Sequence, residues 1–224
     1  CQDDKEETAR YNVKEFFRIR SVGDTIYLLD YNRDLQEVFS SRSVMDQKGI
    51  LLGIVPEDVP YETNKQDSIL AFVQNRTLWM YNKKNEELTK VFSFAEEDTQ
   101  DVRSLNDQHA VRIISMDDHG NIAFAVYGYM NRGEHEGEVG VGIYYFNVDS
   151  NLIQEKGFIP STKSFAIAED ELGKMVYYNH AQELLYVLAD QVLYRIDLDK
   201  NQQEVLAKGL EAGKYAAVSY THLT

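Results

Sequence analysis

The fold is decided by a six-residue motif, Thr77-Leu78-Trp79-Met80-Tyr81-Asn82, because the chain contains the same pattern four times. In each copy an aliphatic residue is followed by an aromatic residue, a variable residue, a large apolar residue and then Asp or Asn. The other copies are Thr25-Ile26-Tyr27-Leu28-Leu29-Asp30, Gly142-Ile143-Tyr144-Tyr145-Phe146-Asn147 and Val192-Leu193-Tyr194-Arg195-Ile196-Asp197. Successive copies are 52, 65 and 50 residues apart. Self-similarity at such a period indicates a repeat architecture.

Short apolar segments of strand length flank each copy across polar turns. Segments 69–73 and 184–188 precede a copy, and segments 35–40, 88–94, 152–159 and 203–206 follow one. A further upstream strand is predicted at 50–55, 111–116 and 175–179. No stretch sustains the spacing of an amphipathic helix, so the chain is predicted to be all-β. Four antiparallel strands per repeat are typical of a β-propeller blade.

The repeats divide the chain into about three and a half to four blades. An acidic segment at 1–10 precedes a blade at 11–41 that lacks its first strand. Fuller blades are expected at 49–95, 111–159 and 164–210, and residues 215–218 look like the start of another. Closed propellers have four to eight blades. The sequence therefore predicts an open, incomplete propeller whose uncovered edges favour self-association.

The chain resembles bacterial β-propellers of the TolB-like, WD40-like and quinoprotein-like kind, because the aromatic-x-x-Asp pattern of Tyr194 to Asp197 is typical of their third strand. Through segment 127–142 it is also similar to uncharacterised envelope-associated propeller proteins of Gram-positive anaerobes. The resemblance implies an extracytoplasmic place in a bacterial cell envelope and no known activity. The Gly-His and Trp-Asp dipeptides of true WD40 blades are absent from the sequence.

Composition argues against several functional classes. The chain has 23 Lys and Arg against 37 Asp and Glu, which gives a net charge of −14 and repels nucleic acids and anionic lipid surfaces. Its one cysteine, Cys1, excludes an internal disulfide and a multi-cysteine zinc site. The sequence contains no nucleophile elbow, phosphate loop, dinucleotide fingerprint or zinc-protease motif. We therefore expect no cofactor.

Both ends of the sequence carry expectations of their own. Cys1 is either the lipidated start of a mature lipoprotein or a cut within a longer chain. A membrane is expected to be a partner only through that lipid or through a missing anchor. Residues 218–224 resemble translated sequencing-adapter read-through, so 219–224 is expected to be a non-native tail.

The segment 126–142 is the most individual part of the sequence, since it holds five of the thirteen glycines and accounts for the longest repeat spacing. It is predicted to be a hairpin with an extended loop, for which three interpretations remain open, one of them contact with a partner. The candidate contact residues are Tyr129, Met130, Asn131, Arg132, Glu134, His135 and Glu136. The alternatives are a solvated extension and a metal site that uses Glu134, His135, Glu136 and Glu138.

Other polar and aromatic positions have structural interpretations. The third residue of each motif (Tyr27, Trp79, Tyr144 and Tyr194) is predicted to fill the interface between blades rather than to stack on a sugar. Asp117 to Asn121 is predicted to form a turn with Gly120 at positive φ rather than a calcium site, and the Asp or Asn that ends each motif is predicted to start a turn. His109 and His180 are expected at the surface or in hydrogen bonds.

Two functions remain open on the sequence alone. The first is a non-catalytic platform for an unknown protein or small ligand. The second is the propeller half of an enzyme, a peptidase or a glycan-active protein, whose catalytic residues lie outside this chain.

Overall fold

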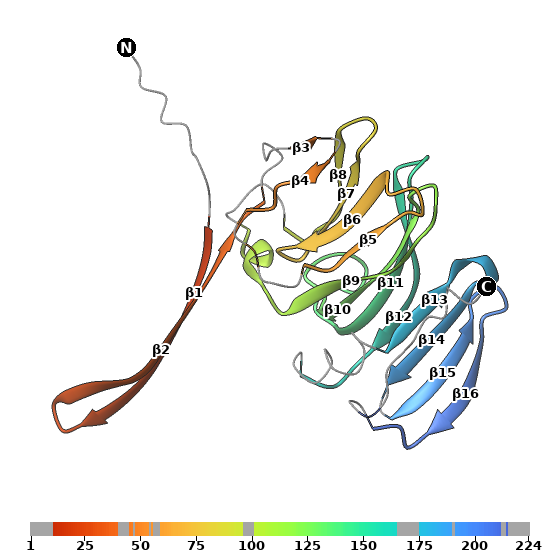
Figure 1. Ribbon diagram of the computed structural model, residues 1–224. Coiled ribbons are helices and arrows are strands. Elements are labelled where there is room, and N and C mark those ends of the chain that lie inside the picture. Colours follow the sequence, from red (N-terminus) through yellow and green to blue (C-terminus); the bar gives the residue numbers. More distant parts are fainter. Residues whose placement is uncertain are drawn as a thin grey trace, which may run out of the picture. The chain divides into compact units, whose positions relative to one another are not determined.

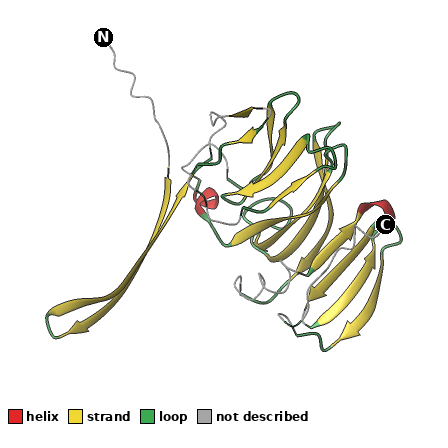
Figure 2. Ribbon diagram, viewed as in Figure 1, coloured by secondary structure: helices red, strands yellow, loops and turns green. Residues whose placement is uncertain are grey.

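The computed structural model describes residues 11–39, 45–46, 48–53, 55, 59–95, 101–164, 175–189, 191–211 and 214. Strands dominate these residues, and the helices among them are two short 3₁₀ helices, η1 (Val102–Leu105) and η3 (His180–Gln182) (Figure 2). None of the helices in the described part of the chain has the length and apolar character that crossing a bilayer requires. The chain divides into two compact units, Cys1–Val59 and Pro60–Thr224.

The second unit contains three consecutive four-stranded antiparallel sheets (Figure 1). The first sheet consists of β5 (Tyr61–Thr63), β6 (Ile69–Gln74), β7 (Thr77–Asn82) and β8 (Glu87–Phe92). The next consists of β9 (His109–Met116), β10 (Ile122–Tyr129), β11 (Val139–Asn147) and β12 (Leu152–Pro160). The last consists of β13 (Val176–Asn179), β14 (Leu184–Ala189), β15 (Val192–Asp197) and β16 (Gln202–Lys208).

In each of these sheets the repeated motif forms the third strand and is followed by the same turn. The side chain of Asn82 accepts hydrogen bonds from the backbone of Lys84 and Asn85. Asn147 accepts one from Ser150 in the same way, and Asp197 accepts one from Lys200. Residues four positions after these side chains have positive φ, namely Glu86, Asn151 and Asn201. The prediction that the terminal Asp or Asn starts a turn is confirmed in these three copies.

A β-bulge recurs at the same place in all three sheets. The pairing of the third with the fourth strand shifts between Leu78 and Trp79, between Ile143 and Tyr144, and between Leu193 and Tyr194. An extra residue in the fourth strand increases its local twist. The bulge therefore belongs to the repeat, immediately before the aromatic position that the motif copies share.

The first two sheets of this unit share a hydrophobic core. Leu78 and Met80 from β7 belong to one buried cluster with Ile122, Phe124 and Val126 from β10. Because side chains alternate along a strand, one face of β10 points to the first sheet. The intervening residues of β10, Ala123 and Ala125, belong to a second cluster with Val176, Leu185 and Val187 of the last sheet. The middle sheet is thus covered on both faces.

Polar contacts also fasten consecutive sheets to each other. The Asn64 amide donates to the carbonyl of Asp118, which links the β5–β6 and β9–β10 turns. Lys156 of β12 lies 3.2 Å from Glu183, which also accepts a hydrogen bond from the Tyr178 hydroxyl. Burial, together with that carboxylate, raises the pKa of Tyr178. These contacts join neighbouring sheets in the manner of adjacent blades.

The second unit is therefore an open segment of a β-propeller, as the sequence predicts. Its sheets follow one another in chain order, each has four antiparallel strands, and neighbouring sheets pack face to face. The described residues do not close into a ring.

The first unit differs from the blade predicted at 11–41. It holds a two-stranded sheet of β1 (Tyr11–Val22) and β2 (Thr25–Glu37) and a short pair of β3 (Met45–Asp46) and β4 (Gly49–Ile50). The motif copy at 25–30 lies within β2, and no turn follows Asp30. β1 offers a partner along the whole of β2, and Tyr31 opposite Phe17 continues the ladder where a turn was expected.

The upstream strand predicted at 50–55 is also wrong for the residues of this segment that the structure describes, because 51–53 and 55 are not in a strand. β4 ends at Ile50, and Gly53 has a φ of +76°, which interrupts an extended strand. β5 takes its place as the first strand of the first four-stranded sheet, because Tyr61 to Thr63 pair with Leu70 to Phe72. The segments predicted at 1–10, 215–218 and 219–224 lie outside the described residues.

Candidate interaction site

The loop between β10 and β11 lies against the segment that leads into β9. We call residues 130–138 together with 101–109 the loop platform. The Tyr129 N–H donates to the Gln108 carbonyl at 2.7 Å, which brings the two segments side by side at one end of the middle sheet. The loop closes on itself through Gly137, whose N–H donates to the Met130 carbonyl at 2.9 Å. The predicted extension is therefore an ordered loop with a fixed neighbour.

Asn131 anchors the start of the loop. Its side-chain amide donates to the carbonyls of Arg103 and Asn106, at 2.8 and 3.0 Å. The residue is 2% exposed, so these bonds form in a desolvated place where an amide hydrogen bond is strong. Met130 beside it is 1% exposed and belongs to the core between the first two sheets. Both residues hold the loop in place, and because they are buried they cannot contact a binding partner.

Arg132 provides the central anchor. Its Nε donates to the Phe94 carbonyl at 2.9 Å, and one terminal nitrogen donates to Asp101 at 2.7 Å and to Ser104 at 3.2 Å. The side chain is 18% exposed. One guanidinium of the β10–β11 loop thus donates hydrogen bonds to three acceptors in the chain before β9. Hydrogen bonds from a charged donor are shorter and stronger than those from a neutral one.

Arg103 adds a second link between the same two segments. It donates to Asp101 at 2.9 Å and lies 3.4 Å from Glu136 at the tip of the loop. The hydrogen bonds from Arg103, joined by that from Arg132, hold the pKa of Asp101 well below its usual range. The ionised form of Asp101 is therefore favoured, and it is the form that pairs with both arginines.

His135 fastens the far side of the loop. Its ring stacks on Phe158 of β12 with centroids 3.8 Å apart and planes 11° from parallel. Nε2 lies 3.0 Å from Glu155 and Nδ1 lies 3.3 Å from Glu138. Partial desolvation opposes protonation, but the hydrogen bonds to Glu155 and Glu138 outweigh it and raise the pKa of His135. His135 is therefore an anchor as well as a sequence-predicted contact residue.

The surface that remains is small and mixed in character. Glu134 and Glu136 are exposed at the tip of the loop. On the neighbouring segment Val102 is 75% exposed, next to the partly exposed Arg103. Sequence reasoning missed Val102, Arg103 and Asp101, because nothing local connects residues 101–104 with a hairpin about thirty positions downstream.

His109 does not lie at the surface, which is one of the two placements expected for it. It is 5% exposed and packs edge-on against Phe94 with ring centroids 4.8 Å apart. Burial lowers its pKa to about 4, and the nearby Arg76 acts in the same direction. The ring is therefore neutral at physiological pH, and it is a buried part of the loop platform. His180 meets the expectation: it stacks on Tyr145 at 3.7 Å and lies 3.0 Å from the Tyr178 hydroxyl.

The acidic residues of the loop do not gather around a common point. Among the described residues no three His, Cys, Asp or Glu side chains converge in a way that holds a metal ion. At the other end of the sheet, Asp117 accepts hydrogen bonds from the backbone of His119, Gly120 and Asn121, and Gly120 has a φ of +97°. The prediction of a turn at 117–121 is confirmed.

The motif aromatics do not share one environment. Tyr144 is partly buried and stacks with Phe124 of its own sheet at 5.4 Å and with Phe92 of the preceding sheet at 5.8 Å, which is the interblade position predicted for it. Trp79 and Tyr194 are partly buried. Tyr27 departs from the prediction because it is 52% exposed in β2. Its hairpin has two strands, so its faces are not covered as those of a blade are.

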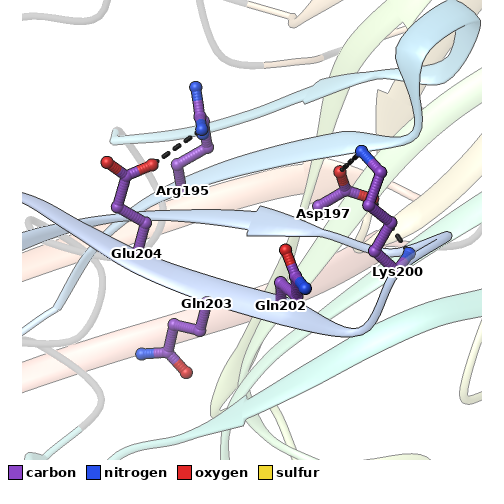
Figure 3. Close-up of a pocket in the computed structure, with 6 residues that line it drawn as sticks. All are labelled: Arg195, Asp197, Lys200, Gln202, Gln203 and Glu204. Atoms are coloured by element: carbon purple, nitrogen blue, oxygen red, sulfur yellow. Dashed lines mark hydrogen bonds and ion pairs between the residues drawn. The ribbon is translucent and has the colours of Figure 1, made fainter.

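A pocket lies on the last sheet, apart from the loop platform. It has a volume of about 420 Å³ and is lined by Arg195, Asp197, Lys200, Gln202, Gln203 and Glu204 (Figure 3). Arg195 lies 2.7 Å from Glu204, and Lys200 lies 2.7 Å from Asp197. Figure 3 shows Gln203 turned to the other side of its strand. The charges are paired within the sheet, so the pocket offers a ligand no uncompensated charge.

Comparison with known proteins finds distant structural similarity alone. No protein-family model matches the chain, and no curated protein matches it. Similar solved structures include an oligogalacturonate lyase in complex with manganese, at 15% identity, 63% of this chain, 34% of that chain and a TM-score of 0.41. A second is the oligogalacturonate lyase of Vibrio parahaemolyticus, at 14% identity, 63% of this chain, 34% of that chain and a TM-score of 0.39.

A third is dipeptidyl peptidase 4 of Porphyromonas gingivalis, at 10% identity, 88% of this chain, 32% of that chain and a TM-score of 0.39. The lyase and the peptidase have β-propeller folds. The chain spans about a third of the length of each of these three structures.

Proposed function

We propose that this chain is a non-catalytic recognition module that binds a protein or peptide through the exposed residues of the loop platform. The binding surface consists of Val102, Arg103, Glu134 and Glu136. The observation that carries the proposal is the anchoring of the loop by Arg132, which reaches Phe94, Asp101 and Ser104 at once.

Anchoring matters because binding costs the free energy of ordering whatever is mobile. A side chain rich in rotamers costs about 0.5–1.5 kcal/mol when a partner immobilises it, and a free loop costs more. Here Arg132, Asn131 and His135 already hold the loop through contacts on both of its sides. A loop that is longer than the hairpin needs, and yet is fixed in this way, is suited to present a surface to a partner.

The chemistry of the surface favours a polypeptide. Val102 offers an apolar contact that is 75% exposed. Its chain neighbour Arg103 offers a donor group, and Glu136, which lies 3.4 Å from Arg103, offers an acceptor group. An apolar centre with a polar rim is the usual anatomy of a protein interface. By its resemblance to envelope-associated propellers, the module is assigned to the extracytoplasmic side of a bacterial envelope.

A peptide array and a glycan array, each probed with the whole chain, test the proposal. We expect binding to a subset of peptides that is abolished by the double variant Val102→Asp, Glu136→Ala. The matched control is Leu152→Asp, because Leu152 is 60% exposed and begins β12 at the end of the sheet away from the platform. Binding that both variants retain would contradict the assignment of the surface.

The alternative, the propeller half of a peptidase or glycan-active enzyme, stays a prediction. Because the catalytic residues of that enzyme would lie outside this chain, turnover of peptide or oligosaccharide substrates by the chain itself would contradict both the alternative and the non-catalytic assignment. Each array hit is therefore incubated with the protein and analysed by mass spectrometry for cleavage.

A further inference from the structure

The hairpin of β1 and β2 exposes more apolar surface to solvent than a stable two-stranded sheet does. All of β1 and most of β2 are exposed. Phe17, Ile19, Ile26 and Leu28 are each between 55% and 67% exposed. An isolated two-stranded hairpin is marginally stable at best, and stable sheets bury one face. The hairpin therefore needs a surface that covers it.

The register shows which face needs cover. Phe17 lies opposite Tyr31 and, beyond a bulge that leaves Leu29 unpaired, Ile19 lies opposite Leu28. On each side of this bulge alternate residues of the two strands share one side of the hairpin. We call this side the apolar face of the hairpin; it consists of Tyr11, Val13, Glu15, Phe17, Ile19 and Ser21 on β1 and of Ile26, Leu28, Tyr31, Arg33, Leu35 and Glu37 on β2. The opposite face is mostly polar, with Lys14 opposite Asp34 and Arg18 opposite Asp30.

The apolar face is already internally ordered. Phe17 and Tyr31 pack with ring centroids 5.0 Å apart, and the Tyr31 hydroxyl donates to Glu15 at 2.6 Å. Arg33 lies 3.8 Å from the same carboxylate. These contacts place one acidic and one basic group side by side in the middle of an apolar surface.

We infer that this face is where two copies of the chain associate. The two hairpins pack face to face around a two-fold axis parallel to their strands, at the spacing of about 10 Å that is usual for packed sheets. Such an axis sets β1 of one copy over β2 of the other. Each residue of one copy then lies over the residue that pairs with its equivalent across the hairpin of the other copy, and the reverse contact is its two-fold equivalent.

In this arrangement apolar side chains face apolar side chains, and opposite charges face each other. Phe17 of one copy lies over Tyr31 of the other, and Ile19 lies over Leu28, so apolar groups meet along the face. Glu15 of one copy lies over Arg33 of the other, and the reverse contact is its equivalent. An axis that crossed the strands at Glu15 would instead bring Glu15 over Glu15, which like charges oppose.

The charge of the chain favours the hairpin over other places for self-association. Residues 11–37 contain four basic and five acidic side chains, so they contribute one of the fourteen net negative charges. Copies of an acidic chain repel each other most weakly where they are nearly neutral. The hairpin is long, apolar and close to neutral. It is therefore the segment through which we expect two copies to associate.

Light scattering after size-exclusion chromatography of the whole chain is the first test. We expect a mass of twice 25.8 kDa for the unaltered chain. Phe17→Lys should lower it to the monomer mass at the same concentration, whereas Phe16→Lys should leave the dimer intact. The two residues are adjacent and are 55% and 57% exposed, but they lie on opposite faces of β1.

Charge reversal provides the second test, which folding defects cannot imitate. Glu15→Arg and Arg33→Glu should each give monomers, because each sets like charges over one another in a pair of identical copies. Mixed in equal amounts, the two variants should form a one-to-one dimer. The introduced arginine of one variant then faces the introduced glutamate of the other, and the unaltered Arg33 of the first faces the unaltered Glu15 of the second. A monomeric unaltered chain would overturn the proposal, and so would a mixture that stays monomeric.

Discussion

Arg132 and Asp101, thirty-one residues apart in the chain, lie 2.7 Å from each other between guanidinium and carboxylate. This ion pair joins the β10–β11 loop to the chain that leads into β9. Asp101 also receives Arg103, and the two arginines keep the carboxylate ionised. Asp101, which lies outside the hairpin itself, is therefore one of the residues that fix the shape of the loop platform.

Removing the arginine should release the loop without unfolding the sheets. Arg132→Ala leaves the Phe94 carbonyl and the Asp101 carboxylate without their shared donor, in a place where the side chain is 18% exposed. We expect a loss of about 1–3 kcal/mol and faster amide exchange in residues 130–138. Arg103→Ala is the control: its side chain is 47% exposed, so the loss should stay below about 1 kcal/mol. Equal effects of the two variants would show that Arg132 is not the central anchor.

Trimming the loop should cost stability, although the hairpin needs only two residues to turn. Replacing residues 131–138 by Asn-Gly removes the Asn131 and Arg132 anchors and the stacking of His135 on Phe158. We expect retained β-sheet circular dichroism with a melting temperature lowered by several degrees, because about 1–3 kcal/mol is lost. A melting temperature equal to that of the unaltered chain would mean that the loop is a solvated extension.

The interface between the first two sheets of the second unit should be the part of this unit most sensitive to substitution. Phe124 is fully buried, and its ring packs against that of Phe92 in the preceding sheet with centroids 5.5 Å apart. We expect Phe124→Ala to cost about 3–5 kcal/mol by chemical denaturation, as large-to-small core changes do. Leu152→Ala, at a residue that is 60% exposed, should change stability by less than about 0.5 kcal/mol. A small effect at Phe124 would mean that the two sheets do not share a core.

Stability should fall in mild acid because of His109. Its folded pKa of about 4 lies below the value of about 6.5 of an unfolded histidine, so the unfolded chain binds the proton first. The stabilisation is complete above pH 6.5 and is lost as the pH falls from 6.5 towards 4, by about 3 kcal/mol in all. The measurement is urea denaturation across this range for the unaltered chain and for His109→Gln.

The difference between these two proteins isolates the histidine, since carboxylates titrate alike in both. We expect the pH dependence to be weaker in His109→Gln and to persist in His119→Gln, at an exposed residue of the β9–β10 turn. If the free energy of unfolding depends on pH in the same way in His109→Gln as in the unaltered chain, His109 is not a buried neutral ring.

The sequence by itself determined the elements that depend on neighbouring residues. The motif strands β7, β11 and β15, the strands beside them and the Asx turns after Asn82, Asn147 and Asp197 all follow from alternation and turn chemistry within about ten residues. The same local rule misjudged Asp30, whose turn signal was overridden by pairing with Arg18.

Only the tertiary structure decided the rest. Nothing near Tyr27 shows that its strand belongs to a two-stranded sheet, because exposure depends on which strands are added beside it. Arg132 finds Asp101, and Phe94 covers His109, only once two sheets have packed together. Contacts between residues distant in the chain depend on how whole sheets are placed, and a periodic sequence pattern specifies the strands within each sheet but not the side chains that meet between sheets.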